Sequence, residues 1–359
     1  MIGMKEIFAM DYIRSVEMDR VPVTNKEYES SEIMKYDLLF ARQSLTLEGA
    51  GKCSIVVSVD EPTVFESHLI RLRIDTKKAN PFFIYYYYKS SIGKNQIKSL
   101  VQQVAAAGLR GKELIELGIK VPHIEKQNQI ASILKSLDDK IEVNRKINEN
   151  LEQQAQALFK SWLAGCHEEV TIGDLSENIT DYTKCNNPEV VLINSSDVTE
   201  GFFEHHNLSE NKNLKGHFKK RFQKGDILYS QVRPRNRHWG YCTFNADNYL
   251  ASTQLMVIRN RPDVISSILL FQYIIEDKVW MDFTLRTETR SGTFPQGNYE
   301  DLSAIKVPFG ANVKELSDNL ENIYSLIFKN EQESRRLATL RDTLLPKLMS
   351  GELKVNEVY

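Results

Sequence analysis

A seam of regularly spaced, mostly apolar residues between positions 130 and 162 constrains the fold of this chain more than any other feature. The seam positions follow one another in alternating steps of four and three: Ile130, Leu134, Leu137, Ile141, Asn144, Asn148, Leu151, Ala155, Leu158 and Trp162. This spacing keeps one face of a helix against a partner helix in a coiled coil. No glycine or proline interrupts the segment. The seam therefore predicts a helix on the order of 50 Å long, at 1.5 Å per residue, that needs a partner.

A second copy of the seam lies 186 positions further along the chain. Adding 186 to each number gives Leu316, Leu320, Ile323, Ile327, Asn330, Ser334, Leu337, Arg341, Leu344 and Leu348. The match extends beyond the helix, because Ile119-Lys120-Val121-Pro122 recurs as Ile305-Lys306-Val307-Pro308. Such internal similarity indicates a duplicated architecture. The chain therefore contains two long helices that can pair with each other.

Both seams carry polar residues near their middle. An antiparallel pairing would place Asn144 opposite Ser334 and Asn148 opposite Asn330. A parallel pairing would also bring these polar residues together, so the layer alone does not decide the direction. Buried asparagines usually specify the register of a coiled coil at a cost in stability. The alternative is that these positions only tolerate water in the seam.

The repeat divides the chain into two globular units that alternate with the two helices. The predicted parts are a first unit at 1–122, a central helix at 123–166, a second unit at 167–308, a distal helix at 309–352 and a tail at 353–359. Short β-branched or aromatic runs, such as Leu38–Ala41 and Asp226–Tyr229, predict strands. The run 264–282 predicts one helix. Short strands mixed with helices, without a βαβ rhythm, indicate α+β units.

The first unit is shorter at its front than the second. Only 36 residues precede Asp37, whereas 59 residues of the second unit, 167–225, precede its counterpart Asp226, a difference of 23. We expect the tail, ELKVNEVY, to dock on the first unit and to supply part of its opening strand. The sequence leaves open whether this short unit is functional.

Composition excludes several classes of protein. Of the 359 residues, 42% are hydrophobic and 26% charged, as in an ordinary soluble protein. The apolar runs at 82–88 and 268–275 are shorter than the ~20 residues of a membrane span. No secretion signal opens the chain, so we expect a cytoplasmic location. The four cysteines stand far apart, without the spacing of a metal site.

A search for catalytic motifs finds none that fits its chemistry. No phosphate-binding or dinucleotide-binding glycine loop occurs. Asn187-Pro188-Glu189-Val190 lacks the aromatic residue with which an amino-methyltransferase stacks a flipped base. Pro262-Asp263, followed by Glu276 and Lys278, matches a nuclease pattern by letters, but the last two fall in a predicted helix. We therefore expect no catalytic residues, no metal site and no cofactor in this chain.

Basic residues concentrate in two stretches although the net charge is −2. Between Lys212 and Arg237 there are nine basic residues and one acid, and between Lys89 and Lys112 there are five and none. Arginine suits guanine edges, and asparagine or glutamine suits adenine. The candidate DNA-binding residues are Gln231, Arg233, Arg235, Asn236, Arg237, Lys219, Lys220 and Arg221 in the second unit, and Arg42, Gln43, Arg110 and Lys112 in the first. Charge runs are often only solvated faces, but recurrence in both units favours DNA binding.

Two different DNA-binding units on one helix pair would recognise two different half-sites, and the length of the helices would set the gap between those half-sites. A homodimer would instead recognise a palindrome. The pattern therefore predicts an asymmetric, bipartite DNA site, although neither the bases nor the gap length can be inferred.

The helical segments resemble those of the specificity subunit of type I restriction–modification enzymes. The resemblance rests on Gly118-Ile119-Lys120-Val121-Pro122, on Glu125-Lys126-Gln127-Asn128-Gln129-Ile130, on Ala157-Leu158-Phe159-Lys160-Ser161-Trp162 and on the ending 343–353, TLLPKLMSGEL. It implies two target-recognition domains and two long helices packed antiparallel. It also implies a subunit without catalysis that positions two methyltransferase subunits, with motor–nuclease subunits joining them. S-adenosylmethionine, ATP and Mg²⁺ would then belong to those partners.

Apolar residues outside the seams would suit a helix of another subunit: Ile133, Ile147, Leu163, Leu326, Leu340 and Leu345. Two alternatives stay open. The chain could be the specificity portion of another type of restriction–modification enzyme, or a coiled-coil adaptor that does not read DNA.

Overall fold

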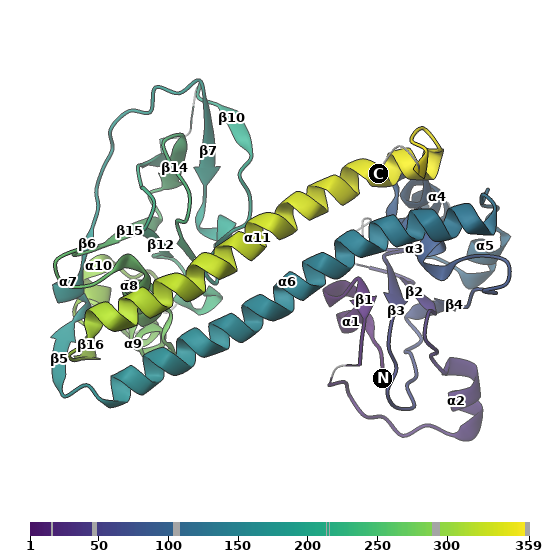
Figure 1. The fold of residues 1–359 in the computed structure, drawn as a ribbon, viewed down its shortest axis with the longest axis horizontal. Coiled ribbons are helices and arrows are strands. Elements are labelled where there is room, and N and C mark those ends of the chain that lie inside the picture. The colour runs from purple at the N-terminus through teal and green to yellow at the C-terminus, as the bar shows by residue number, and fades with distance from the viewer. Residues whose placement is uncertain are drawn as a thin grey trace. The chain divides into compact units, whose positions relative to one another are not determined.

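A computed structural model describes residues 1–15, 17–44, 49–102, 108–212, 214, 216–288 and 295–355. The chain forms two compact units, Met1–Asn144 with Gln332–Tyr359 and Arg145–Glu331. Two long helices, α6 (Ile124–Ala164) and α11 (Val313–Ser350), each contribute one half to each unit (Figure 1). The predicted α+β class with an intramolecular pair of long helices is confirmed.

The first unit packs helices against one small sheet. Its sheet has the strand order β1-β3-β2-β4, in which β1 runs parallel to β3 and the other pairs are antiparallel. Its elements before α6 are α1 (Met4–Ala9), β1 (Tyr12–Ile13), α2 (Asn25–Ser31), β2 (Leu38–Ala41), β3 (Cys53–Val56), β4 (Leu69–Leu72), α3 (Pro81–Lys89), α4 (Ser91–Gln102) and α5 (Gly111–Glu116). The four tyrosines of α3, at 85–88, are all buried, so they belong to the core.

The second unit contains two four-stranded sheets. One has the order β13-β12-β15-β6 and is antiparallel, and the other has the order β10-β7-β14-β11. The elements are β5 (Glu168–Thr171), α7 (Ile172–Leu175), β6 (Ser176–Asn178), β7 (Glu189–Ile193), η1 (Ser195–Asp197), β8 (Val198–Thr199), β9 (Phe202–Phe203), β10 (Leu208–Glu210), β11 (Phe218–Lys220), β12 (Ile227–Ser230), η2 (Pro234–Asn236), β13 (Trp239–Tyr241), β14 (Tyr249–Ser252), β15 (Leu255–Asn260), α8 (Ser267–Ile275), α9 (Asp277–Glu288), α10 (Tyr299–Ser303) and β16 (Lys306–Phe309).

The two units repeat the same ion pair at the ends of two neighbouring strands, which supports the duplication. In the first, Arg73 donates from Nε and Nη2 to both oxygens of Asp37, at 2.8 Å each. In the second, Arg259 binds Asp226 in the same way at 2.7 Å. Both carboxylates are buried. Because a buried charge is costly unless it is paired and hydrogen-bonded, each arginine is required by the aspartate beside it.

The polar layer of the long helices pairs antiparallel. In the first unit, Asn144 Nδ2 donates to Ser334 Oγ at 3.2 Å. In the second unit, Asn330 Nδ2 donates to Asn148 Oδ1 at 2.8 Å, and Asn148 Nδ2 donates to Ile327 O at 3.1 Å. These are the partners expected for antiparallel helices. The observed partners therefore show that the two helices run antiparallel, which the sequence had left open.

Burial along the seams departs from the strict alternation at one place. Leu134, Leu320 and Ile327 are buried as predicted, whereas Leu158 is 40% exposed and its neighbour Phe159 is only 3% exposed. An α-helix has 3.6 residues per turn, so a 3.5-residue seam drifts around its surface. The ring of Phe159 instead packs edge-on against Tyr273, with centroids 5.0 Å apart. Four further apolar seam positions are buried: Ile130, Ala155, Leu316 and Leu348. The others are partly buried: Leu137, Ile141, Leu151, Trp162, Ile323, Leu337 and Leu344.

Several of the apolar residues outside the seams belong to the cores. Ile133 and Leu345 lie in the core of the first unit, and Leu163 packs against the core of the second. This corrects the prediction of Ile133 and Leu345 as docking residues, because buried side chains are not accessible to a partner. Leu163 is partly buried. Ile147, Leu326 and Leu340 are exposed.

The single helix predicted at 264–282 is two helices, α8 and α9. Glu276 separates them with an extended backbone, at φ −63° and ψ 131°. The break lets α8 stay almost fully buried while α9 exposes one face. One straight helix could not bury both the apolar residues of α8 and the apolar face of α9.

Leu353 and Val355 in the tail pack against the core of the first unit. Residues 356–359, Lys215 in the basic run and the glycine-bearing segment 291–294 lie outside the described residues. Within the described ranges, no helix is long and apolar enough to cross a membrane.

Candidate nucleic-acid interface

The arginine loop, residues 231–238, follows the buried strand β12 directly. Its backbone crosses a second segment, where Gly297 N donates to Gln231 O at 2.8 Å and Val232 forms a bridge with Gln296. We call this pair of backbone contacts between two loop segments a loop crossing. On its other side, Gln231 N donates to Gln254 O at 2.9 Å. Strand β12 and two flanking segments therefore hold this loop in place.

The candidate residues of this loop differ in what they contact. Arg235 makes a bidentate ion pair with Glu288, and Arg237 Nη2 lies 2.8 Å from Asp277 Oδ1. Arg233 and Asn236 are exposed, whereas Gln231 is partly buried. The Arg235 guanidinium lowers the pKa of the Glu288 carboxyl, which stays ionised as its partner. The sequence predicted the same role for these arginines, but in the structure they differ in their contacts and exposure.

The backbone just before the second basic segment of this unit, Lys219–Arg221, contacts the same turn as the arginine loop, at residues 253 and 254. Thr253 N donates to His217 O at 2.8 Å, and the next residue, Gln254, contacts Gln231. Lys219 faces solvent, with its ammonium 4.8 Å from the ring centre of Tyr182. Residues 253 and 254 therefore contact both the backbone before Lys219 and the start of the arginine loop.

Lys220 does not belong to this surface. It is 6% exposed, and its ammonium donates to Leu255 O at 2.6 Å. Burial lowers the pKa of Lys220, and the charge of Lys219 lowers it further. Alternation along β11 turns neighbouring side chains to opposite faces, so a run of basic letters cannot all point outward. Arg221 is also partly engaged, since its Nη2 donates to Asp247 O at 2.6 Å.

The first unit has the same loop crossing, with fewer basic residues. Leu109 N donates to Arg42 O at 2.7 Å, and Gln43 forms a bridge with Gly108. These pairs correspond to Gly297–Gln231 and Val232–Gln296 in the second unit. Arg42 and Gln43 are exposed, and Arg110 next to the crossing lies 3.9 Å from Glu113. Three of the four candidates thus meet at one place.

Lys112 lies one turn further, on α5. It is exposed, and its ammonium lies 4.0 Å from Glu116 Oε1. Exposed pairs of this kind are weak and are screened by salt, so Lys112 and Arg110 both remain able to bind an anion.

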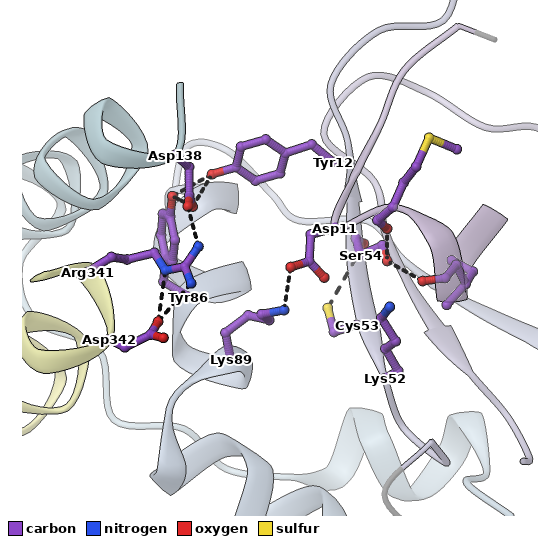
Figure 2. A network of polar contacts seen from close by, with 12 residues as sticks. Asp11, Tyr12, Lys52, Cys53, Ser54, Tyr86, Lys89, Asp138, Arg341 and Asp342 are labelled. Atoms are coloured by element: carbon purple, nitrogen blue, oxygen red, sulfur yellow. Dashed lines mark hydrogen bonds and ion pairs between the residues drawn. The ribbon is translucent and has the colours of Figure 1, made fainter. Parts of the chain in front are cut away.

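A polar joint in the first unit was not predicted from the sequence. Figure 2 shows Asp138 of α6 surrounded by Tyr12, Tyr86 and Arg341, which come from three other elements. Burial raises the pKa of both tyrosines well above the usual range. A charged residue at a seam position, Arg341, was the one signal in the sequence. The joint anchors the globular part of this unit on its helix pair.

Within the described ranges, no group of three or more His, Cys, Asp or Glu side chains could hold a metal ion. The polar residues at both loop crossings are hydrogen-bond donors and cations, which suit an anionic, base-bearing ligand.

Residues 9–153 match the family described as "Type I restriction modification DNA specificity domain". This stretch belongs to the type I specificity family. The resemblance carried by the helical motifs is thereby confirmed. The matched residues include the first loop crossing, Tyr12, Tyr86 and Asp138 of the polar joint, and α6 up to residue 153.

Curated relatives of this family match different shares of the chain. Over 180 residues it is 33% identical to the HindI specificity subunit of Haemophilus influenzae, covering 49% of this chain and 39% of that protein. Over 310 residues it is 22% identical to the MjaIX specificity subunit of Methanocaldococcus jannaschii, covering 77% and 70%. The match to HindI thus spans about two fifths of that relative's length.

One solved structure shows a similar fold. The S subunit of a type I restriction–modification system from M. genitalium superposes with a TM-score of 0.52 at 16% identity, over 94% of this chain and 88% of that chain. This chain therefore shares its fold with that S subunit.

Proposed function

We propose that this chain is the DNA-recognition subunit of a type I restriction–modification complex. The observation that carries the proposal is the repeated loop crossing: Gln43–Gly108 in one unit and Val232–Gln296 in the other, each beside exposed basic side chains. Basic side chains bind phosphates and position a protein on DNA, while arginine, asparagine and glutamine read base edges. The family match of residues 9–153 supports the same function.

In this proposal each unit reads one half-site. The two crossings carry different residues, Arg42 and Gln43 against Gln231, Arg233 and Asn236, so the half-sites differ. A gap of constant length separates the two half-sites in this proposal. The chain therefore recognises an asymmetric, bipartite sequence in double-stranded DNA.

The chain itself has a recognition and scaffolding role rather than a catalytic one. Two methyltransferase subunits and motor–nuclease subunits are its proposed partners in the cytoplasm, and they would use S-adenosylmethionine, ATP and Mg²⁺. The exposed apolar residues of the long helices, Ile147, Leu326 and Leu340, are available to such partners.

Selection from a randomised pool of DNA duplexes tests the proposal. The full-length chain is immobilised, bound duplexes are amplified through several rounds, and the enriched pool is sequenced. We expect two short motifs separated by a constant gap. Enrichment of one continuous motif would contradict the bipartite reading, and enrichment of none at low salt would contradict DNA recognition by this chain. The matched control is Lys112→Ala combined with Arg42→Ala, which should weaken only the first motif.

A further inference from the structure

The backbone of the arginine loop adopts an uncommon conformation that contacts with neighbouring segments must maintain. Arg233 and Arg237 both lie in the left-handed region, at φ 50° and φ 52°. Residues other than glycine rarely adopt this backbone conformation, and it persists where neighbouring contacts enforce it. Three contacts do so here: Arg233 N donates to Pro295 O at 3.1 Å, Trp280 Nε1 donates to Pro234 O at 2.9 Å and Glu200 N donates to Arg237 O at 3.2 Å. The loop is thus shaped before any ligand binds.

Arg237 contributes to that shape through its side chain. Its guanidinium carbon lies 4.2 Å from the ring centre of Trp280 and 5.9 Å from that of Trp239. Its Nη2 also binds Asp277. A guanidinium placed beside two indole rings and a carboxylate fastens the end of the loop to α9 and β13.

Arg235 is engaged through the edge that base recognition would need. Its Nε and Nη2 both bind the carboxylate of Glu288 on α9. The same two-donor geometry is what arginine offers to O6 and N7 of guanine. While this pair holds, the Nε–Nη2 edge of Arg235 is occupied and is not offered to a guanine.

Arg233 and Asn236 differ from both of these arginines. They are exposed, and in the part of the chain that the structure describes no hydrogen bond or ion pair of either side chain is seen. They stand within the same rigid loop, so their positions are defined while their polar groups remain available.

We propose that Arg233, with Asn236 beside it, determines the sequence preference of the second unit, and that Arg235 and Arg237 are positioning residues. This rests on the proposed function and assigns the roles within its second half-site. Arg233 reads a guanine through its two-donor edge, and Asn236 offers the amide that suits an adenine. The carboxylates of Glu288 and Asp277 hold the other two arginines, and through them the loop.

The first experiment replaces Arg233 and repeats the duplex selection. Lysine keeps the charge but lacks the two-donor edge, so Arg233→Lys should lose the preference for one base in the second motif. A bidentate contact discriminates by roughly 5- to 150-fold, which is the expected change in relative affinity at that base. Binding to a fixed mixed-sequence duplex should change by less than about twofold. Arg233→Gly, which accepts the left-handed backbone, guards against misfolding of the loop.

The second experiment exchanges the charges of the Arg235–Glu288 pair. Arg235→Glu alone places two carboxylates together and should weaken binding to every duplex. Arg235→Glu combined with Glu288→Arg restores an ion pair, and the enriched motif should be that of the wild type. Thermal unfolding of each variant shows whether the loop has been restored. A purely structural change would not alter which base is enriched.

The outcomes separate the two proposals. Enrichment of no motif by the wild-type chain would overturn the proposed function. A bipartite motif that Arg233→Lys and Arg233→Gly both leave intact would overturn only the role of Arg233. Loss of one base position in the charge-exchanged variant, with a wild-type unfolding midpoint, would show that Arg235 reads DNA and would overturn its positioning role.

Discussion

Asp138 on α6 accepts a hydrogen bond from Arg341 on α11, with Oδ1 and Nη1 2.6 Å apart. The other oxygen of Asp138 accepts from Tyr86 at 2.6 Å and from Tyr12 at 2.9 Å. One carboxylate thus joins β1, α3 and both long helices of the first unit (Figure 2). Hydrogen bonds from three side chains satisfy the carboxylate of Asp138, so its partial burial is tolerated.

The second unit makes the same joint without charge. The counterparts 186 residues away are Gln272 for Tyr86, Tyr324 for Asp138 and Ala155 for Arg341. Gln272 Nε2 donates to the Tyr324 hydroxyl at 2.6 Å, and Ala155 is buried. The duplicated joint has therefore diverged into a charged version and a neutral one.

Neutralising the charged joint should destabilise the first unit. We expect Asp138→Asn to lower the free energy of unfolding by about 1–3 kcal/mol, because Arg341 loses one of its two carboxylate partners in a half-buried site and keeps only Asp342. Asp139→Asn is the matched control, since Asp139 pairs with Lys135 at the surface, and exposed pairs contribute little. Denaturant titration measures both. Equal losses in the two variants would contradict the role of the joint.

Alkaline pH should weaken the first unit through the same joint. Burial raises the pKa of Tyr12 and Tyr86, and the charge of Asp138 adds to it. Unfolded tyrosines titrate near pH 10. The unfolded chain therefore releases these protons first, so the contribution is fully present below about pH 10 and falls as pH rises above it. The expected slope is about 1.4 kcal/mol per pH unit for each phenol.

Absorbance of tyrosinate, followed together with circular dichroism, tests this dependence. Tyr86→Phe should make the alkaline loss shallower. Tyr182→Phe should not, because Tyr182 is exposed. An ionisation of all tyrosines near pH 10 while the fold persists would contradict the prediction.

The shift of the seam predicts unequal effects of two leucine substitutions. Leu134→Ala removes a fully buried side chain and should cost about 2–5 kcal/mol of unfolding free energy. Leu158→Ala should change it by less than about 0.5 kcal/mol, because Phe159 has taken its place in the core. Chemical denaturation of the two variants checks the comparison. Similar costs would mean that the 3.5-residue seam holds to the end of α6.

The repeated aspartate–arginine pair predicts damage confined to one unit at a time. Arg259→Ala leaves the carboxylate of Asp226 buried without its partner and should cost about 3–5 kcal/mol. Arg73→Ala should act in the same way on Asp37. Hydrogen exchange resolved along the chain should show loss of protection in strands β12 and β15 for the first variant, and in β2 and β4 for the second. Loss in both units from either variant would contradict independent cores.

Neighbouring lysines on β11 should differ in their effect on DNA affinity. Lys219→Ala should reduce the slope of log affinity against log salt by about 0.9, the value for one phosphate contact. Lys220→Met should leave that slope unchanged, because its ammonium is buried against Leu255 O. Binding to one mixed-sequence duplex at several salt concentrations measures both slopes. A reduced slope for Lys220→Met, with an unchanged unfolding midpoint, would show that the lysine reaches DNA.

Much of the fold follows from patterns that act over short distances. The two seams, their 186-residue offset and the polar pairs Asn144/Asn148 and Asn330/Ser334 are written in the residue order, because a helix repeats its surface every few residues. The strands Leu38–Ala41 and Ile227–Ser230 follow from β-branched and aromatic runs. The candidate loops are found for the same reason, as basic segments directly after those strands.

Long-range packing decided the remainder. The direction of the helix pair, the exposure of Leu158, the burial of Lys220 and the division of α8 from α9 depend on neighbours that are distant in the chain. The roles within the arginine loop depend on Glu288, Asp277 and Trp280, whose distance from Arg235 and Arg237 no local pattern encodes. Sequence by itself determined which side chains were present and in what period. Only the tertiary structure decided which charges are paired, because pairing depends on geometry that the whole fold creates.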